Sequence, residues 1–405
     1  MSTPDYDVAI VGAGIVGATL ACALGGSGLR VALVEARQPA RTWSAHSRDL
    51  RVSAITSGSM QVLNALGVWP AIAAQAQPFH AMQVWDAAGG SIGFDSAESD
   101  ADSLGSIVEN RVLQQALLAC VERHGNLAWR CPESISGVEF GDAEAVLTTA
   151  AGSTLRARLV VAADGPDSGI RQLAGIATHG WAYGQSALVV NVITEQPHQE
   201  TAWQRFLPSG PLAFLPLTDG YSAVVWSLPT DEAARLCALQ EDEFKGELAA
   251  AFESRLGNIM QIGPRASFPL RLLWAERTAQ ARLALIGDAA HTVHPLAGQG
   301  VNLGIMDAAV LAEVIVDAHA RHKDIGALSV LRRYERWRKG DVLATGVALE
   351  ALHRLFGDAR PSVGWARSAG LRLVDALGPL KNLIMRHAAG KAGELPRLAR
   401  GVKLS

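Results

Sequence analysis

Three glycines near the N-terminus have the spacing of a nucleotide-binding turn. Gly12, Gly14 and Gly17 form a GxGxxG segment that follows a short β-branched run and opens an apolar helical stretch. In such a segment the first glycine permits a tight turn, the second lets a pyrophosphate approach the backbone at the helix N-terminus, and the third allows close packing of helix on strand. Glu35 ends the next apolar run and can accept hydrogen bonds from both ribose hydroxyls of an adenosine. Because its charge would repel a 2′-phosphate, these residues predict bound FAD or NAD.

Two later apolar runs also end in an aspartate beside a glycine. Asp164-Gly165 ends one run, and Gly287-Asp288 ends another far down the chain. Behind the second, a glycine-punctuated loop leads into a helical pattern over about 301–319. Asp-Gly is a common turn pair, so neither segment identifies a site by itself.

The elements that carry these segments begin as a β-α-β unit and then become rich in strands. Residues 6–35 have the periodicity of strand, helix and strand. Further predicted strands, separated by turn residues, cover 135–140, 145–149, 154–163, 188–193, 212–217, 221–226 and 282–286. The stretch 186–228 indicates a second domain on a mixed or antiparallel sheet, with Asp219-Gly220 as a hairpin turn. Beyond Ile325 the pattern is mostly helical, with prolines as breaks.

The composition excludes several classes of protein. At about 150 residues per domain, 405 residues predict two or three lobes. Apolar residues make up 49% and charged residues 19%, which is typical of a folded globular protein. The net charge of −3 lacks the basic excess of a nucleic-acid-binding protein, so DNA and RNA are not expected partners. Four cysteines without a CxxC pair favour a reducing cytosol, and we therefore predict a cytoplasmic protein.

Taken together, the motifs resemble those of the group A FAD-dependent aromatic monooxygenases, the para-hydroxybenzoate hydroxylase type. The matching segments are Gly12 to Gly17, Leu159 to Gly165 followed by Ser168 and Arg171, and Leu285 to His291. Within that class, the loop from His291 to Gly304 and the later segment from Leu331 to Arg336 look most like the ubiquinone-biosynthesis hydroxylases. The resemblance spans most of the chain.

The resemblance implies flavin contacts from the second half of the chain. The family aspartate at the position of Asp288 meets the ribityl chain, and the loop that follows runs along the pyrimidine side of the isoalloxazine. The loop residues implied are Gly298, Gly300, Val301 and Asn302. A helix that begins near Val301 would aim backbone N–H groups at flavin N1 and O2. The backbone carbonyl of Pro295 would point toward the substrate hydroxyl.

Further residues of the first half of the chain match family positions beside FAD. Asp164 and Gly165 correspond to the motif with a dual part in binding FAD and the nicotinamide nucleotide. Arg51 matches an arginine beside the flavin and its pyrophosphate, an anion that a guanidinium suits. Arg111 matches another flavin-contacting arginine, although either arginine could equally be a solvated helix residue.

The implied fold is α/β, with a Rossmann-like FAD-binding domain, an inserted β-rich substrate domain and a helical C-terminal region. The FAD-binding domain is predicted to comprise 1–75, 101–180 and 265–325. The substrate domain is predicted to comprise 76–100 and 181–264, and the C-terminal region 326–405. The implied reaction hydroxylates the ring of a polyprenylated phenol or benzoquinol intermediate in ubiquinone biosynthesis. It uses bound FAD, with NAD(P)H and O2 as co-substrates.

Alternative functions stay open from the sequence. The same fold could act on a soluble aromatic compound, or the chain could be a non-catalytic flavin-binding accessory protein of a ubiquinone complex. His291 and Tyr183 are candidates for a base, but no side chain is assigned that role. A metal site at His291, His294 and Asp288 is rejected, because a three-residue period on a glycine-rich loop is no recognised ligand frame.

Two regions admit a structural as well as a functional interpretation. Leu212, Phe214 and Trp226 could line a ring pocket, yet aromatic strand residues are more often core. The stretch 379–405 holds six basic residues against one acid, beside apolar residues at helical spacing. A basic amphipathic helix there would suit peripheral contact with the inner membrane face or with a ubiquinone-biosynthesis complex, and an ordinary packing helix explains the pattern equally well.

Overall fold

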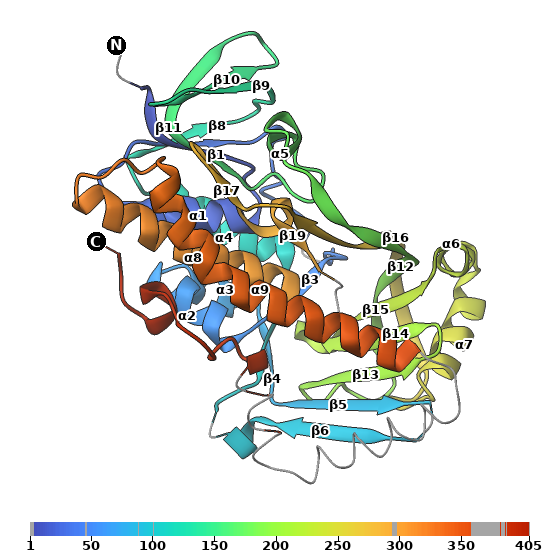
Figure 1. The fold of residues 1–405 in the computed structure, drawn as a ribbon. Coiled ribbons are helices and arrows are strands. Elements are labelled where there is room, and N and C mark those ends of the chain that lie inside the picture. Colours follow the sequence, from blue (N-terminus) through green and yellow to red (C-terminus); the bar gives the residue numbers. More distant parts are fainter. Residues whose placement is uncertain are drawn as a thin grey trace.

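The computed structural model describes most of the chain as two large sheets flanked by helices (Figure 1). The described residues are 4–44, 47–87, 89–99, 101–293, 298–357, 381, 385 and 387–404. Pro295, the predicted proline breaks and most of 358–386 lie outside them.

The first sheet is built on parallel strands in the order β17-β18-β11-β1-β2-β8. Its parallel members are β1 (Tyr6–Val11), β2 (Val31–Val34), β8 (Leu127–Arg130), β11 (Thr154–Ala162) and β18 (Leu283–Leu285). Antiparallel additions are β9 (Ile135–Phe140), β10 (Ala145–Thr149) and β17 (Ala279–Gln280). Helices α1 (Ile15–Leu24), α4 (Asn110–Val121) and α8 (Gln299–Ala320) pack on it and form the largest buried core. Buried parallel strands need helices on their faces, which explains why these strands are almost wholly apolar.

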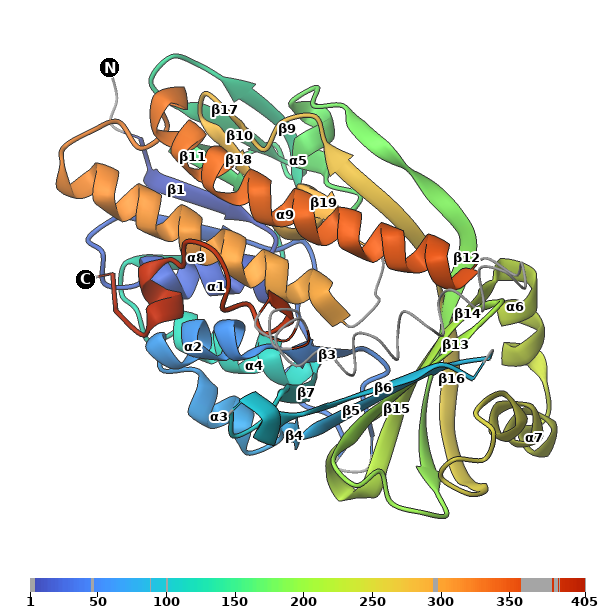
Figure 2. The ribbon, with the colours of Figure 1, turned by 60° about the horizontal axis from the view of Figure 1, so that its bottom comes forward.

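The second sheet is mostly antiparallel, in the order β19-β16-β12-β15-β14-β13-β5-β6. Its strands are β5 (Ala81–Asp86), β6 (Ser91–Asp95), β12 (Thr178–Thr194), β13 (Thr201–Leu207), β14 (Gly210–Pro216), β15 (Tyr221–Pro229), β16 (Ile259–Ala275) and β19 (His291–Thr292). Helices α6 (Thr230–Ala238) and α7 (Glu241–Ala251) cover its outer side, as Figure 2 shows. Strands β12 and β16 have 17 residues each and run as a long ribbon from this sheet toward the first.

Smaller elements join the two sheets. A third sheet pairs β3 (Val52–Ile55), β7 (Gly105–Glu109) and β4 (Gln77–Phe79), and the short helices are α2 (Ser57–Ala65), α3 (Trp69–Ala73) and α5 (Gly169–Leu173). Single turns of 3₁₀-helix are η1 (Ser96–Ser99), η2 (Thr218–Gly220), η3 (Gly287–Ala289) and η5 (Arg397–Arg400). Helix α9 (Leu328–Gly357) contacts β17 near one end and β13 and β14 near the other, so it bridges both sheets (Figures 1 and 2).

The structure confirms the predicted α/β class, the β-α-β unit and the three-stranded meander of β9, β10 and β11. The predicted hairpin turn is η2, with Asp219 at φ 59°. The third sheet and the length of the β12–β16 ribbon were not predicted. The domain boundaries themselves stay a prediction.

Within the basic C-terminal stretch, Lys381, Met385, His387 and Ala388 are helical, in line with the predicted helix, whereas the part beyond residue 390 differs from it. Residues 391–404 form no α-helix and contain only η5. Lys381 is buried and pairs with Glu98 at 2.7 Å, and Arg397 pairs with Glu313 and Asp317. These two cations are held by carboxylates within the fold, so they are not part of a free basic face. Among the described helices, none combines the length and apolar character needed to cross a membrane.

Candidate flavin site

The carboxyl ends of four parallel strands meet at one edge of the first sheet. Strands β2, β1, β11 and β18 are neighbours in that order, and each is followed by one of the predicted segments. Glu35 follows β2, Gly12 follows β1, Asp164 follows β11 and Asp288 follows β18. In open α/β sheets this edge is where ligands bind. Segments up to 276 residue positions apart, from 12 to 288, are thereby brought together.

The glycine turn between β1 and α1 has the close contacts that its spacing predicts. Gly12 has φ +103°, and a Cβ there would lie 2.3 Å from the carbonyl oxygen of Ala163. A Cβ on Gly17 would lie 2.0 Å from the carbonyl oxygen of Gly12. A Cβ on Gly14 would meet nothing within 4 Å, and no side chain caps the helix that Gly14 begins. The N-terminus of α1 therefore faces open space, and its unpaired N–H groups suit a pyrophosphate there.

Glu35 is fixed beside this turn by backbone donors. Its Oε2 accepts a hydrogen bond from Ala13 N at 2.8 Å, and its Oε1 accepts one from Arg37 N at 3.1 Å. Each carboxylate oxygen keeps a second lone pair. The predicted contact with ribose hydroxyls is compatible with this arrangement and stays a prediction.

Close packing joins the first and third motifs. A Cβ on Gly304 of α8 would lie 2.4 Å from Cγ2 of Val16 and 3.3 Å from Cα of Gly287. Gly287, at φ +58°, is itself in contact with Val16. The start of α1, the turn after β18 and the first turns of α8 therefore touch one another.

Three polar groups around this edge have no hydrogen-bond or ion-pair partner among the described residues. The Arg51 guanidinium is exposed, and the Asp288 carboxylate lies close enough to feel the charge of Arg51. Burial raises the pKa of Asp288, while His291, Arg51 and Arg271 oppose that rise. Oδ1 of Asp164 is sealed from solvent and unpaired, although Oδ2 accepts a hydrogen bond from Ile170 N. Buried polar atoms are almost always paired, so these groups fit a site for a polar, partly anionic ligand.

Arg171, part of the second motif, holds two of the turns together. Its Nη1 donates to the carbonyl of Ala289 and its Nη2 to the carbonyl of Pro166, both at 2.8 Å. Arg171 is 4% exposed, and burial lowers its pKa. It links the turn after β11 to the turn after β18.

Asp307 of α8, which was not among the predicted site residues, organises the same region. Asp307 is fully buried and accepts hydrogen bonds from Gly287 N at 3.0 Å, His291 Nε2 at 2.7 Å and Arg338 Nε at 2.7 Å. Burial alone would raise the pKa of Asp307, but His291 and Arg338 outweigh it and hold that pKa below its ordinary value. The ionised carboxylate requires Nε2 of His291 to be the donor. A single acid within the apolar run 303–312 was the signal that could have revealed it.

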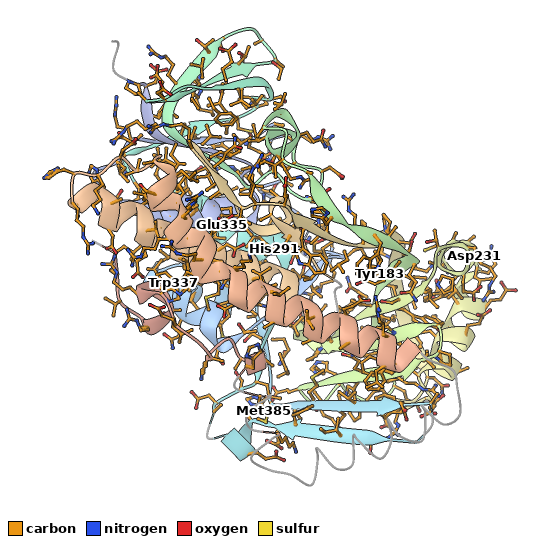
Figure 3. The ribbon with its side chains drawn as sticks, in the orientation of Figure 1. Tyr183, Asp231, His291, Glu335, Trp337 and Met385 are labelled. Atoms are coloured by element: carbon orange, nitrogen blue, oxygen red, sulfur yellow. The ribbon has the colours of Figure 1, made fainter. Side chains whose placement is uncertain are left out.

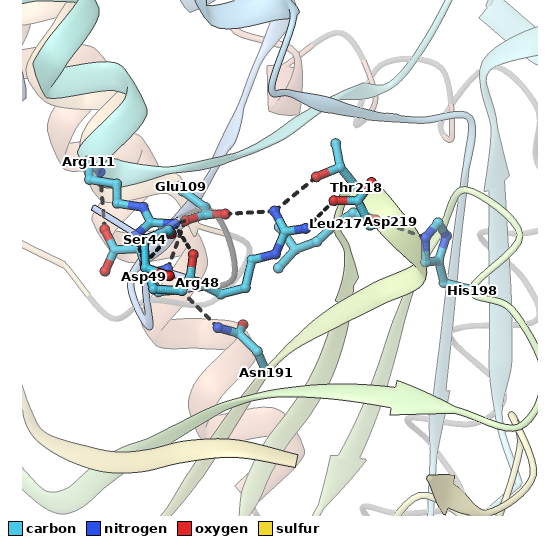
Figure 4. Close-up of polar contacts among 11 residues, drawn as sticks. Ser44, Arg48, Asp49, Glu109, Arg111, Asn191, His198, Leu217, Thr218 and Asp219 are labelled. Carbon is cyan, nitrogen blue, oxygen red and sulfur yellow. Dashed lines mark hydrogen bonds and ion pairs between the residues drawn. The ribbon is translucent and has the colours of Figure 1, made fainter. Parts of the chain in front are cut away.

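The terminal guanidinium nitrogens of Arg111 are bonded to other protein groups. Arg111 pairs with Glu109 at 2.7 Å (Figure 4). It also donates to the Ser47 hydroxyl at 2.9 Å and lies over the ring of Trp43. Its Nε is buried and unpaired. Arg111 thus positions the loop before Arg51, and direct flavin contact by it stays a prediction.

The same network reaches the second sheet. Arg48 approaches Glu109 at 3.3 Å, donates to the Thr218 hydroxyl at 3.2 Å and pairs with Asp219 (Figure 4). Asn191 of β12 donates to the Asp49 carbonyl at 3.0 Å. We call these contacts of the 47–51 loop with β12 and η2 the cross-sheet clasp.

The α8 start is fastened to β3 by Asn302. Its Nδ2 donates to the carbonyls of Ala54 and Gly298, and its Oδ1 accepts from Thr56 N at 3.0 Å. The side chain of Asn302 is therefore a positioning group, and any flavin contact at this residue falls to its backbone. Gly298 adopts a left-handed φ of 62° as N-cap, without a side-chain cap for α8. Helix α8 begins at Gln299, two residues before the predicted start near Val301, so Gly300 and Val301 lie in its first turn.

The other candidates have structural partners. His291 is buried against Asp307, and Tyr183, on the long ribbon, donates to Glu350 of α9 at 2.8 Å, which together with burial raises its pKa (Figure 3). Phe214 stacks on Phe252 beneath α7, and Leu212 and Trp226 share that core, so the ring-pocket interpretation of these three residues is wrong. The described residues hold no group of three or more His, Cys, Asp or Glu suited to a metal ion.

Comparison with known proteins agrees with this geometry. The model of the FAD binding domain family matches residues 5–345. The p-nitrophenol 4-monooxygenase PnpA from Pseudomonas putida has the same fold, with a TM-score of 0.79 at 21% identity over 97% of this chain and 100% of that one. Fold and site together define an FAD-dependent monooxygenase.

Relatives of higher sequence identity show to which group of FAD-dependent monooxygenases the chain belongs. Ubiquinone hydroxylase UbiL of Rhodospirillum rubrum is 41% identical over 402 residues, which cover 98% of this chain and 93% of that protein. The 3-demethoxyubiquinol 3-hydroxylase of Escherichia coli is 37% identical over 394 residues, 96% of this chain and 100% of that protein. The chain belongs to the family of FAD-dependent ubiquinone-biosynthesis hydroxylases.

Proposed function

We propose that this protein hydroxylates the ring of a polyprenylated phenol or benzoquinol intermediate of ubiquinone biosynthesis, with NAD(P)H and O2 as co-substrates. The observation that carries the proposal is the near-full-length similarity to two hydroxylases of ubiquinone compounds. The unpaired groups at the sheet edge support it, because FAD offers a pyrophosphate, a ribityl chain and a ring system to partner them.

The residues of this chain would hold FAD in an extended arrangement. The N–H groups that open α1 would bind the pyrophosphate, and Arg51 would neutralise part of its charge. Asp288 would accept hydrogen bonds from ribityl hydroxyls. The uncapped N-terminus of α8 would stabilise negative charge on the reduced ring system. When bound, FAD accepts hydride from the nicotinamide and activates O2, and the protein supplies orientation and exclusion of water.

The test begins with the visible absorption spectrum of the purified protein. We expect a flavin spectrum, and faster NAD(P)H oxidation in air when a prenylated phenol is added, with a hydroxylated product. Stimulation by soluble phenols alone would favour the alternative that the protein hydroxylates a soluble aromatic compound. Bound FAD without turnover on any phenol would favour the accessory-protein alternative. A protein that cannot be reconstituted with FAD would contradict the proposal and both alternatives.

We further propose peripheral contact with an anionic membrane, which would suit a lipid-tailed substrate. Arg400, Lys403 and Lys391 are exposed, and Val402 beside them is 51% exposed. Replacing Arg400 and Lys403 with glutamate should weaken binding to anionic liposomes at low salt. Equal binding of variant and wild type at every ionic strength would remove this proposal.

A further inference from the structure

One amide on the second sheet is buried without a partner. Gln204 lies in the middle of β13 and is 7% exposed. Its side chain forms no hydrogen bond with any residue that the structure describes. The Gln204 amide is still partly accessible, since the unpaired atoms that have no solvent exposure in the described chain belong to other residues. A buried carboxamide that makes no hydrogen bond is costly, so Gln204 calls for a partner outside the described residues, such as a bound ligand.

Strand alternation fixes the face on which Gln204 lies. Its neighbour Trp203 packs into the core beneath α6 and α7, so it lies on the outer side of the sheet. Ala202 and Phe206 belong to the apolar clusters on the opposite side. Because side chains two apart share a face, Gln204 lies on that inner side, turned away from α6 and α7.

The row of residues around Gln204 is otherwise apolar. Its register partners are Val84 on β5 and Ala213 on β14, and Ala213 is in turn paired with Val225 on β15. Val189 of β12 continues the row. An unpaired amide in a wall of small and branched apolar side chains is the composition of a ligand site, where few polar groups set the orientation.

The inner side of the second sheet faces the candidate flavin site. Phe206 and Val84 cluster with Val293, which ends the described part of the loop after Asp288, and with Leu303 in the first turns of α8. Phe206 also stacks on Phe356 of α9, with ring centroids 3.7 Å apart. The sheet around Gln204 is therefore packed directly against the elements that flank the predicted isoalloxazine position.

We propose that the Gln204 carboxamide binds an oxygen substituent of the substrate ring and thereby selects which ring edge faces the flavin. This inference rests on the proposed function, since it takes the ligand to be an oxygenated aromatic ring. The amide can donate to a methoxy or hydroxyl oxygen and accept from a hydroxyl. A site built to bond such a group discriminates strongly against analogues that lack it.

The test compares how a change in the Gln204 side chain and a change in the ring substituents affect binding, separately and together. The FAD-loaded wild type and Gln204→Leu are titrated with three geranylated phenyl compounds, and binding is followed by the change in the flavin absorption spectrum. The parent carries a hydroxyl and a methoxy group, the second has methyl in place of methoxy, and the third has hydrogen in place of hydroxyl. Gln83→Leu is the matched control, because Gln83 pairs with Trp203 and lies exposed on the outer face.

We expect Gln204→Leu to bind the parent about tenfold more weakly, with unchanged FAD content and melting temperature. For one of the two analogues the loss should vanish, because the group that Gln204 contacts is already absent. Gln83→Leu should behave as wild type. Equal weakening with all three compounds would show a structural role and overturn the proposal, as would wild-type affinity for the parent. A wild-type holoenzyme that binds none of the three compounds would remove the proposed function, and the inference with it.

Discussion

At the level of single residues, the candidate flavin site contains two kinds of side chain. Some have no hydrogen-bond or ion-pair partner among the described residues, and others are hydrogen-bonded to the protein. Arg51, Asp288 and Asp164 Oδ1 have no described partner. Asn302 instead bonds protein donors and acceptors, and Asp307 accepts hydrogen bonds from three protein donors. The free groups are the ones expected to touch the cofactor. The committed groups fix the turns from which those contacts are made.

The open position at Gly14 gives a prediction about cofactor binding. Gly14→Asp should abolish flavin retention, because its carboxylate would occupy and repel the pyrophosphate position, while its Cβ would meet no protein atom within 4 Å. The flavin-to-protein absorbance ratio of the purified variant measures this. Gly17→Ala is the contrasting variant: its Cβ would clash with the Gly12 carbonyl, so it should lower the melting temperature of the apoprotein, which Gly14→Asp should leave near wild type. Full flavin content in Gly14→Asp would refute the placement.

Asp307 gives a prediction about stability. Asp307→Asn should lower the free energy of unfolding by about 3 kcal/mol, since it removes the buried carboxylate from Arg338 and leaves that buried charge only the partly exposed Asp341 as an ion-pair partner. Because the folded pKa of Asp307 lies below the ordinary value of 3.8, its stabilisation is complete above that pH and is lost as the pH falls through the lowered pKa. Urea unfolding should therefore show a constant difference from wild type between pH 6 and 8, and a smaller one in acid. A difference that grows in acid would contradict the assignment.

At the scale of elements, the cross-sheet clasp joins the loop before β3 to the second sheet. Its ion pair between Arg48 and Glu109 is largely buried, whereas Asp219 is 74% exposed and contributes little to stability. Asn191 adds a neutral hydrogen bond to the same loop. The clasp therefore sets the position of the hairpin more than it stabilises the fold.

Replacing Arg48 should loosen the hairpin selectively. Arg48→Met should speed amide hydrogen exchange at 47–51 and 217–221, because both segments lose their shared cation. Arg235→Met is the control, since Arg235 pairs only with exposed Glu232 and Glu247 between α6 and α7. Unchanged exchange in both segments would show that the clasp does not restrain them.

Across the whole molecule, the last described residues pack into the core beside the first sheet. Segment 391–404 returns over α2 and α8, with Leu398 1% exposed and Leu404 7% exposed in the main core. Trp337 of α9 donates to the Glu394 carbonyl at 2.9 Å. The C-terminus is thus a structural element of the folded chain as well as a carrier of charge.

Loss of this packing should destabilise the protein without any change in charge. Leu398→Ala should cost about 3 kcal/mol, as for other buried leucines, and is measured by thermal or urea unfolding. The double variant Arg400→Ala and Lys403→Ala should unfold like wild type, because both side chains are exposed. If Leu398→Ala were neutral, the segment would not be part of the cooperative core.

The local elements and the nature of their ligand could be predicted from the residues alone. The GxGxxG turn, Glu35 and the strand-ending pairs at Asp164 and Asp288 are contiguous signals, because turn geometry and strand periodicity act over a few residues. Three relations became visible only in the folded structure. Four strand ends share one edge, Asp307 binds His291 and Arg338, and Gln204 faces inward. Those relations depend on strand order, register and helix packing between distant segments, which local spacing does not encode.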